Sequence, residues 1–323
     1  MRTMIHTQQR NALLYFMLII LINLSVLSII ITGIALGIKG YVSDTWVAFE
    51  DVTCCGSICA QCFFTLQTIF TILPWACIAI LLMGACVAIY KAIILPFRHC
   101  RYVRALTPLS IEDHPILKNI LSATRLHEHC VLFDNNETRY AFTSGILRPK
   151  IYLSSGMCSY LTSSELFAVI LHESHHKRNY DPLKLVIVQF LSALNYFLPI
   201  NRYLVKQYIS ATEKAADDNV INFSGEPLEL ASALVKLSKC NSMRMARLST
   251  AFNSEQSVVE ERICRLLETH TQPPCFRNTY LFLSGILSLF VAGIMCLSLF
   301  ARSFDHIHTI GCKATTCHIA KCG

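Results

Sequence analysis

The feature that most constrains this chain is the run from Ala12 to Ile38, which contains no charged side chain. About 20 apolar residues in a helix cross the hydrocarbon layer of a membrane, so this run is long enough for one span. It is also longer than the apolar region of a cleaved signal peptide. Apolar residues make up 53% of the 323 residues and charged residues only 15%, a balance that excludes an ordinary soluble protein. The sequence therefore predicts an integral membrane protein.

Two further apolar runs have the length of membrane spans. One extends from Cys62 to Tyr90 and contains Pro74, which would kink a helix without preventing a span. The other extends from Tyr280 to Phe300. We therefore predict four parts: an N-terminal transmembrane hairpin at 1–95 with spans at about 12–38 and 62–90, a domain at 96–277, a C-terminal transmembrane helix at 278–301, and a short Cys- and His-rich tail at 302–323.

Basic residues beside the spans predict the orientation of the chain in the membrane. Arg2 and Arg10 precede the first span, and four basic residues follow the second within 91–104, whereas the loop between these spans is mainly acidic. Lys and Arg favour the cytoplasmic side. The N-terminus and the domain at 96–277 are therefore expected in the cytoplasm, and the first loop and the tail on the extracytoplasmic side.

Two groups of cysteines lie on the predicted outer side. Disulfides between the loop and the tail are possible in an oxidising compartment. A competing hypothesis is a metal site formed by the tail cysteines with histidines of the tail, although their spacing is looser than that of most zinc sites. The residues concerned are Cys54, Cys55, Cys59 and Cys62 in the loop, and His306, His308, Cys312, Cys317, His318 and Cys322 in the tail.

The domain between the second and third spans has signals for both strands and helices. Three short apolar segments at 131–133, 139–143 and 150–153 are separated by turn residues, which predicts strands that include a hairpin. The sequence from Thr162 to Glu165 then fits a capping box, which opens a helix that should end near Asn179–Pro182. We therefore predict a mostly helical α+β domain with a small sheet.

The segment 183–200 is apolar except for a few polar side chains. Its length approaches that of a membrane span, but Lys184 and Gln189 lie inside it and Pro199 ends it. We interpret it as a helix packed in the domain core or lying against the inner membrane face. The alternative is a fourth span or a re-entrant element.

The predicted helix carries the sequence His172-Glu173-Ser174-His175-His176. Positions i and i+4 lie on one face of a helix, so His172 and His176 can bind one metal ion. Glu173 is close enough to accept a proton from water at that ion without being a ligand. His175 points about 100° away from His176 and is expected at the surface or behind the ligands. The competing explanation is an ordinary solvated helix face.

A catalytic zinc needs a third protein ligand and an open position. Glu213 is the best candidate because it begins an E-x-x-x-D pattern on a predicted helix, with Asp217 one turn further along the same face. Asp217 can accept a hydrogen bond from a ligating histidine and fix its orientation. A solvated acidic face is the competing explanation for this pair.

Together these motifs resemble the BlaR/MecR family of integral-membrane gluzincin peptidases. The resemblance extends from about residue 140 to residue 268. It depends on Ala141–Gly145, Arg148–Leu153, the motif from His172 to His176 followed by Asp181-Pro182, the Glu213–Asp217 motif and Glu260–Leu267.

The resemblance implies a zincin-like (gluzincin) α+β fold and a Zn²⁺ cofactor. It implies that His172, His176 and Glu213 are the zinc ligands, and that Glu173 is the general base or acid. In zincins an edge strand before the active-site helix pairs with an extended substrate. The resemblance therefore assigns substrate binding to the predicted hairpin, with Lys150, Ile151 and Tyr152 as the edge strand.

The chain also departs from this family. Well-known members carry a large extracellular penicillin-binding sensor after the last span, whereas this chain continues for about twenty residues beyond Phe300, so drug sensing is not expected. We predict a membrane-anchored zinc endopeptidase of regulated signalling, in the bacterial inner (plasma) membrane with its catalytic domain in the cytoplasm. The expected partners are the lipid bilayer and a protein substrate, either a transcriptional repressor or a membrane protein, and not nucleic acid directly. The alternatives are a quality-control protease of membrane proteins and a zinc-binding scaffold without proteolysis.

Overall fold

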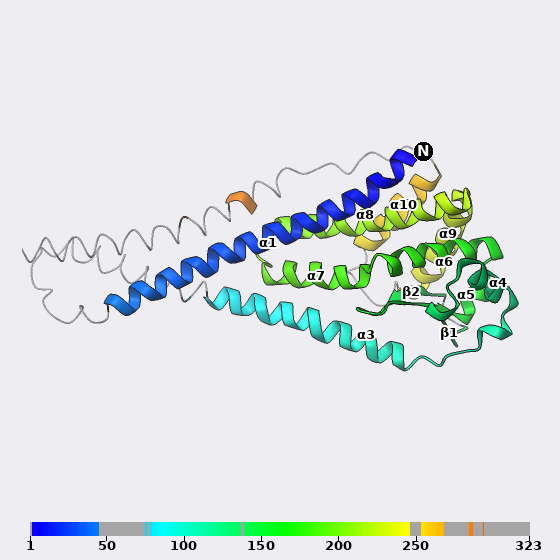
Figure 1. The fold of residues 1–323 in the computed structure, drawn as a ribbon, viewed down its shortest axis with the longest axis horizontal. Coiled ribbons are helices and arrows are strands. Elements are labelled where there is room, and N and C mark those ends of the chain that lie inside the picture. Colours follow the sequence, from blue (N-terminus) through cyan, green and yellow to red (C-terminus); the bar gives the residue numbers. More distant parts are fainter. Residues whose placement is uncertain are drawn as a thin grey trace, which may run out of the picture. The chain divides into compact units, whose positions relative to one another are not determined.

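The computed structural model of this chain describes residues 2–44, 75, 78–136, 139–245, 253–267, 284–286 and 293. These residues are mostly helical, with one small mixed sheet, which confirms the predicted balance of helix and strand (Figure 1). Residue contacts divide the chain into two compact units. Unit 1 comprises Met1–Ile19, Ile89–Leu191 and Arg202–Phe276, and unit 2 comprises Ile20–Ala88, Ser192–Asn201 and Arg277–Gly323. The four-part division predicted from the sequence stays a prediction.

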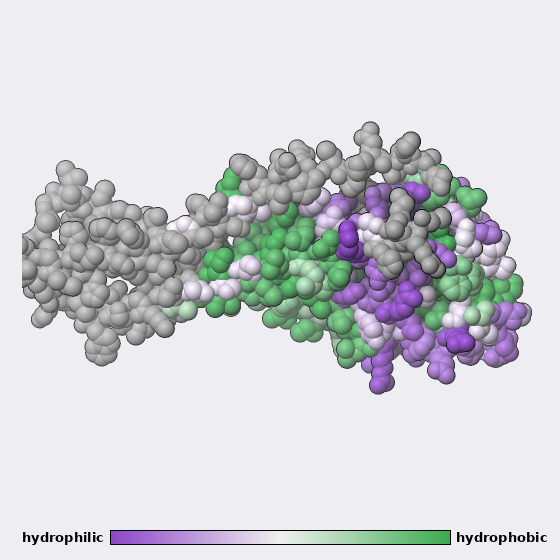
Figure 2. All heavy atoms as spheres, turned by 45° about the horizontal axis from the view of Figure 1, so that its top comes forward, coloured by the Kyte–Doolittle hydropathy of each residue, from purple (hydrophilic) through white to green (hydrophobic). Residues whose placement is uncertain are grey.

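Two helices are long and apolar enough to cross a membrane. The first is α1, Arg2–Asp44, whose candidate span Thr7–Thr32 overlaps the run predicted at 12–38. The second candidate span is Ile78–Arg104, which extends well beyond the predicted end at Tyr90 because a π-helical turn, Tyr90–Ile94, continues into α3, Leu95–Arg104. The start of the predicted second span, most of the third span and both cysteine groups lie outside the described residues. Figure 2 shows one face, on which hydrophobic residues form a continuous patch beside hydrophilic residues.

The sheet belongs to unit 1 and has the strand order β1-β3-β2. The strands are β1 (Cys130–Phe133), β2 (Ala141–Ser144) and β3 (Lys150–Ser154). β2 and β3 form the predicted antiparallel hairpin, while β1 pairs with β3 in parallel. The hairpin turn begins at Gly145, whose φ of +115° suits glycine, and a Cβ atom there would lie 2.6 Å from the carbonyl oxygen of Arg148. β3 is therefore the central strand and β2 is an edge strand.

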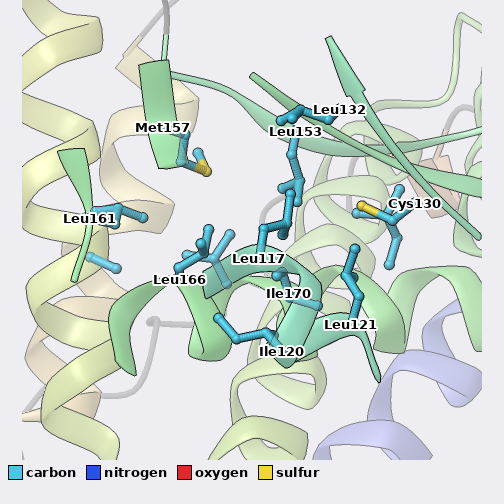
Figure 3. Close-up of a cluster of buried hydrophobic side chains, with 13 residues drawn as sticks. Leu117, Ile120, Leu121, Cys130, Leu132, Leu153, Met157, Leu161, Leu166 and Ile170 are labelled. Carbon is cyan, nitrogen blue, oxygen red and sulfur yellow. The ribbon is translucent and has the colours of Figure 1, made fainter. Parts of the chain in front are cut away.

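Buried apolar side chains join one face of this sheet to the helices of unit 1. The cluster includes Leu117 and Leu121 of α4 (Pro115–Thr124), Leu132 and Leu153 of the sheet, and Ile170 of α6 (Ser163–Arg178), all fully buried (Figure 3). α5 (Ser155–Tyr160) and α9 (Pro227–Met245) add Met157 and Ala233. This core fixes α6 against the sheet.

The start of α6 has the capping box that the sequence predicts. Thr162 accepts a hydrogen bond from the backbone N–H of Glu165, and the Glu165 carboxylate accepts one from the backbone N–H of Thr162. The same carboxylate accepts hydrogen bonds from Ser232 and Lys236 of α9. Glu165 therefore caps the N-terminus of α6 and links α6 to α9.

The predicted apolar segment 183–200 folds into a helical hairpin. α7 (Asp181–Leu194) has 14 residues and is about 21 Å long, which is too short for a hydrocarbon layer of about 30 Å. The chain then turns into α8 (Pro199–Ser224). α7 alone is therefore too short for a complete span, while the core helix, the helix at the inner membrane face and the re-entrant element all stay predictions.

In unit 2, the turn of this hairpin contacts α1 through three buried asparagines. Asn23 Nδ2 donates to Asn201 Oδ1 at 2.9 Å, and both Asn195 and Asn201 donate to Asn23 Oδ1 at 2.9 and 3.0 Å. All three side chains are almost inaccessible to solvent. Because Asn23 lies in the candidate span Thr7–Thr32, these hydrogen bonds join a polar turn to an apolar helix.

We expect Asn23→Ala to lower the free energy of unfolding by about 1–3 kcal/mol, because the buried amides of Asn195 and Asn201 would each lose one of two acceptors and Asn201 Oδ1 would lose its donor from Asn23. Thermal or denaturant unfolding of the full chain in detergent measures the change. Asn222→Ala, at an exposed position of α8, is the matched control and should change stability little. Equal effects of the two substitutions would contradict a structural role for the asparagine cluster.

Candidate metal centre

One turn of α6 places two histidines side by side. His172 and His176 lie at positions i and i+4 of this helix, and their ring centroids are 4.8 Å apart. Their Nε2 atoms are 3.1 Å apart. Glu213 of α8 lies opposite both rings, with Oε2 3.4 Å from His172 Nε2 and Oε1 3.6 Å from His176 Nε2. The structure thus brings together the three residues that the sequence predicts as ligands.

The spacing of these atoms fits a tetrahedral metal ion. Nitrogen and oxygen ligands about 2.0–2.2 Å from a tetrahedral zinc lie about 3.3–3.6 Å from one another. The Nε2–Nε2 separation of 3.1 Å and the distances of 3.4 and 3.6 Å from the two Nε2 atoms to one or the other Glu213 oxygen are close to these values. Among the described residues, His172, His176 and Glu213 form the cluster of His, Cys, Asp or Glu that could hold a metal ion. Three ligands leave the fourth tetrahedral position open.

Carboxylates on the far side of both rings direct the Nε2 atoms toward this cluster. His176 Nδ1 lies 2.8 Å from Asp181 Oδ2, and His172 Nδ1 lies 3.1 Å from Asp217 Oδ1, off the direct line of a hydrogen bond. A proton on each Nδ1 leaves the lone pair on Nε2 free to bind a cation. Asp217 was predicted for this position. Asp181 was not, although it directly follows the end of the helix and begins α7.

Arg262 of α10 (Asn253–Leu266) also reaches the centre, and sequence reasoning gave it no role. Its Nε and Nη2 donate to the two oxygens of Asp217 at 2.9 and 2.7 Å, and its Nη1 donates to Glu213 Oε2 at 2.7 Å. Its Nη2 also lies 3.5 Å from His172 Nε2. Arg262 is 6% exposed. One guanidinium therefore holds the predicted third ligand and the predicted orienting carboxylate in fixed positions.

These contacts decide the charges of the buried groups. Burial and Arg262 lower the pKa of His172, but Asp217 and Glu213 outweigh both and raise the pKa to about 9. Burial raises the pKa of Glu213, but the cations around it, Arg262 first, hold the pKa well below its usual value. Burial followed by the repulsion of His176 lowers the pKa of His175 to about 4. His175 is therefore neutral and buried, not at the surface, and lies outside the ligand cluster.

Glu173 lies beside the cluster and is held by the neighbouring strand. Thr143 of β2 donates a hydrogen bond from Oγ1 to Glu173 Oε2 at 2.8 Å and contacts the Glu173 backbone oxygen at 3.0 Å. The sequence did not indicate this contact, because it joins residues 30 positions apart. The carboxylate is thus oriented without being part of the three-ligand cluster.

The cluster opens into a cleft of about 1010 Å³ in unit 1. Its walls come from α3, the β2–β3 hairpin, α6, α7, α8 and Arg262, and most of the lining is apolar. His172, Glu173, His176 and Glu213 all line it. A cavity of this size and lining is typical of a binding site for an extended ligand.

The hairpin contributes to the cleft in a different way from that predicted. Lys150 and Tyr152 line the cleft, but Ile151 is fully buried. The prediction that these three residues form an edge strand is wrong, because β3 pairs with β1 on one side and with β2 on the other. Among the described residues, no strand pairs with the outer edge of β2, and residues 141–144 of β2 also line the cleft.

Two helical histidines with an adjacent glutamate, faced by a glutamate from a second helix, are typical of metallopeptidases, and two helices apolar enough to cross a membrane are typical of membrane-associated ones. The chain belongs to the BlaR1 peptidase M56 family, whose model matches residues 56–266. It is similar to the regulatory protein BlaR1 of Bacillus licheniformis, with 24% identity over 181 residues. The aligned part is 55% of this chain and 30% of that protein, so the chain spans about a third of the length of this relative. The family resemblance inferred from the motifs is confirmed.

Proposed function

We propose that the protein is a membrane-anchored zinc-dependent endopeptidase. His172, His176 and Glu213 would hold the zinc ion, with Asp181 and Asp217 orienting the histidines. The observation that supports this most directly is the convergence of three side chains: the two Nε2 atoms are 3.1 Å apart, and each lies 3.4–3.6 Å from one oxygen of the Glu213 carboxylate, which suits one tetrahedral ion. Carboxylates beside both Nδ1 atoms support it further, because they can hold a proton there while each Nε2 faces the cluster.

A bound zinc ion would polarise the scissile carbonyl group and lower the pKa of the attacking water to about 7. Glu173 would accept the proton of that water and deliver it to the leaving amine. The hydrogen bond from Thr143 keeps this carboxylate beside the cluster. Arg262 keeps Glu213 and Asp217 ionised, so that one remains a ligand and the other an acceptor for His172.

The substrate would lie along the outer edge of β2 as an extended segment. Backbone N–H and C=O groups at a strand edge bind such a segment without regard to its sequence, and side-chain pockets add selectivity. Lys150 and Tyr152 would contact the substrate from the floor of the cleft and not as an edge strand. The expected substrate is a cytoplasmic or membrane-associated protein in regulated signalling proteolysis. A transcriptional repressor is one candidate, because the relative from Bacillus licheniformis is a regulatory protein.

The proposed location is the bacterial inner membrane, with the metal centre on the cytoplasmic side. Its support is the basic end of α3, where Arg101 and Arg104 lie in the last turn of the second candidate span. A scaffold without proteolysis is less consistent with the site, because such a protein has no need for an oriented Glu173 beside three converging ligands.

The direct test is peptide hydrolysis by the purified full chain in detergent, assayed with a peptide library. We expect cleavage to stop when a chelator such as 1,10-phenanthroline removes the metal, and to return when one equivalent of zinc is added. A non-chelating phenanthroline isomer is the control for non-specific inhibition. Cleavage that continues after the metal has been removed would show that the proposed function is wrong.

A further inference from the structure

The tip of the β2–β3 hairpin exposes apolar side chains at the mouth of the cleft. Leu147 is 78% exposed, more than any other large hydrophobic residue among those that the structure describes, and Ile146 is also exposed. Arg148 and Lys150 follow them and are exposed too. Gly145 fixes the turn, because a Cβ atom there would collide with the Arg148 carbonyl oxygen. A turn of defined backbone conformation thus exposes two apolar side chains, and two cations follow them in the sequence.

The hairpin is attached to α3, which is part of a candidate membrane span. His99 Nε2 and Ser144 Oγ are 2.9 Å apart, and the rings of His99 and Phe142 are in edge contact at 5.7 Å. His99 lies in α3 (Figure 1), toward the end of the candidate span Ile78–Arg104. Because the hairpin contacts His99, the position of His99 along the membrane normal also determines the position of the hairpin.

Along α3 the exposed side chains change from apolar to basic next to His99. Ile93 of the preceding π-helical turn and Phe97 of α3 are both 61% exposed, and Arg98 begins a basic stretch that continues to the end of the helix. Lys91 is exposed before them, and its long side chain can extend toward the headgroups from within the apolar part. Exposed Tyr102 lies in the basic stretch. Apolar residues followed by Arg and an aromatic residue mark the boundary between hydrocarbon and headgroups. His99, and with it Ser144, therefore lies at this boundary.

Chain length places the hairpin tip at the same level. Leu147 is three positions after Ser144 in the sequence, so their Cα atoms are at most about 11 Å apart. The headgroup layer on each side of a bilayer is about 5–8 Å thick. Leu147 therefore lies in or next to the headgroup layer, where an exposed aliphatic side chain gains contact with lipid and the nearby cations attract anionic phosphates.

From this geometry we infer that Ile146 and Leu147 insert into the interface of an anionic bilayer, and that the cleft takes a substrate segment held at that surface. The second part rests on the proposed peptidase function. Pro96 and His99 of α3 and Leu147 of the hairpin line the same cleft as His172 and Glu173, so the entrance to the metal centre lies between a membrane helix and a membrane-inserted turn. The apolar lining suits an apolar extended segment that lies close to the bilayer.

Insertion is tested by tryptophan quenching in proteoliposomes, which needs no enzymatic activity. The full chain with Trp46→Phe and Trp75→Phe receives Leu147→Trp, and the vesicles contain phosphatidylcholine and phosphatidylglycerol brominated in the upper acyl chain. The matched control is Leu228→Trp, which is 64% exposed but flanked by Glu226 and Glu229 and so unsuited to an anionic surface. We expect strong quenching at position 147 and little at position 228. Equal, weak quenching at both positions would overturn the insertion and would favour a protein partner for the tip.

The substrate class is tested with one peptide sequence in two forms, free and carrying an acyl anchor. In the same vesicles we expect the wild-type chain to cleave the anchored form faster, and Leu147→Asp to lose most of this preference, whereas Leu228→Asp should keep it. Equal rates for both forms together with quenching at position 147 would overturn the substrate class alone. If neither form is cleaved, the proposed peptidase function fails, while the quenching result still decides whether the tip inserts.

Discussion

Glu173→Gln is expected to lower the rate of peptide hydrolysis by about 10²–10⁴-fold and to leave the bound metal in place. Glutamine has the size of glutamate and can still accept the hydrogen bond from Thr143, so the geometry around the cluster is retained. It cannot accept a proton from the attacking water. Hydrolysis of a cleavable library peptide, together with the zinc content of the same preparation, measures both effects.

Glu226→Gln is the matched control for this substitution. Glu226 is exposed and lies outside the residues that line the cleft, so neither rate nor zinc content should change. A Glu173→Gln variant that hydrolyses peptides at the wild-type rate would rule out Glu173 as the general base. A variant that loses its zinc would assign Glu173 to metal binding instead.

Arg262→Met is expected to lower the free energy of unfolding of the metal-free protein by about 3–5 kcal/mol. Methionine fills a similar volume but leaves the buried carboxylates of Glu213 and Asp217 without their common cation. Burial raises the pKa of Asp217, and Arg262 is the first of the cations that hold it low. Denaturant unfolding in detergent with a chelator present measures the change, and added zinc should restore part of the stability.

Arg265→Met on the same helix provides the comparison. Arg265 is more exposed and pairs with Asp218, whose pKa is already raised by burial. Asp218 can therefore take up a proton when its partner is removed, so we expect a smaller loss of stability than for Arg262→Met. Equal losses would show that Arg262 is one ordinary ion pair of α10 and not the cation on which the centre depends.

The parts of the fold that the sequence predicted depend on residues close together in the chain. The capping box joins Thr162 to Glu165, the histidine pair spans one helical turn, and the hairpin joins neighbouring strands. Each of these patterns has a fixed spacing set by helix or strand geometry, so the residue types and their separation are sufficient.

The parts that the sequence missed depend on contacts between distant segments. β3 became the central strand because β1, about twenty residues earlier, pairs with its other edge, and no local pattern specifies that choice. Arg262 lies 45 residues after Asp217. A basic residue on an amphipathic helix does not by itself indicate a partner so far away in the sequence. In the sequence, Asp181 is an acidic residue at the start of a helix, which indicates no partner. Its contact with His176 depends on the fold.

The segment that contains α7 and the start of α8 is another feature that the sequence alone did not determine. Apolar composition alone could not separate a short buried helix from a membrane span. The structure shows that α7 is too short for a complete span and that the asparagines of the following turn bind Asn23 of α1. The sequence did not indicate that Asn195 and Asn201 are buried, because no local pattern distinguishes a buried asparagine from an exposed one.

The central claim is that His172, His176 and Glu213 together bind one zinc ion, and metal content tests it most directly. The full chain is purified in detergent, loaded with zinc, freed of excess metal and measured by elemental mass spectrometry. The matched variants are His176→Ala, Glu213→Ala and, as the control, His129→Ala at an exposed position. The account predicts one zinc ion per chain in the wild type and in His129→Ala, and almost none in the other two variants. Equal zinc content in all four proteins would contradict it.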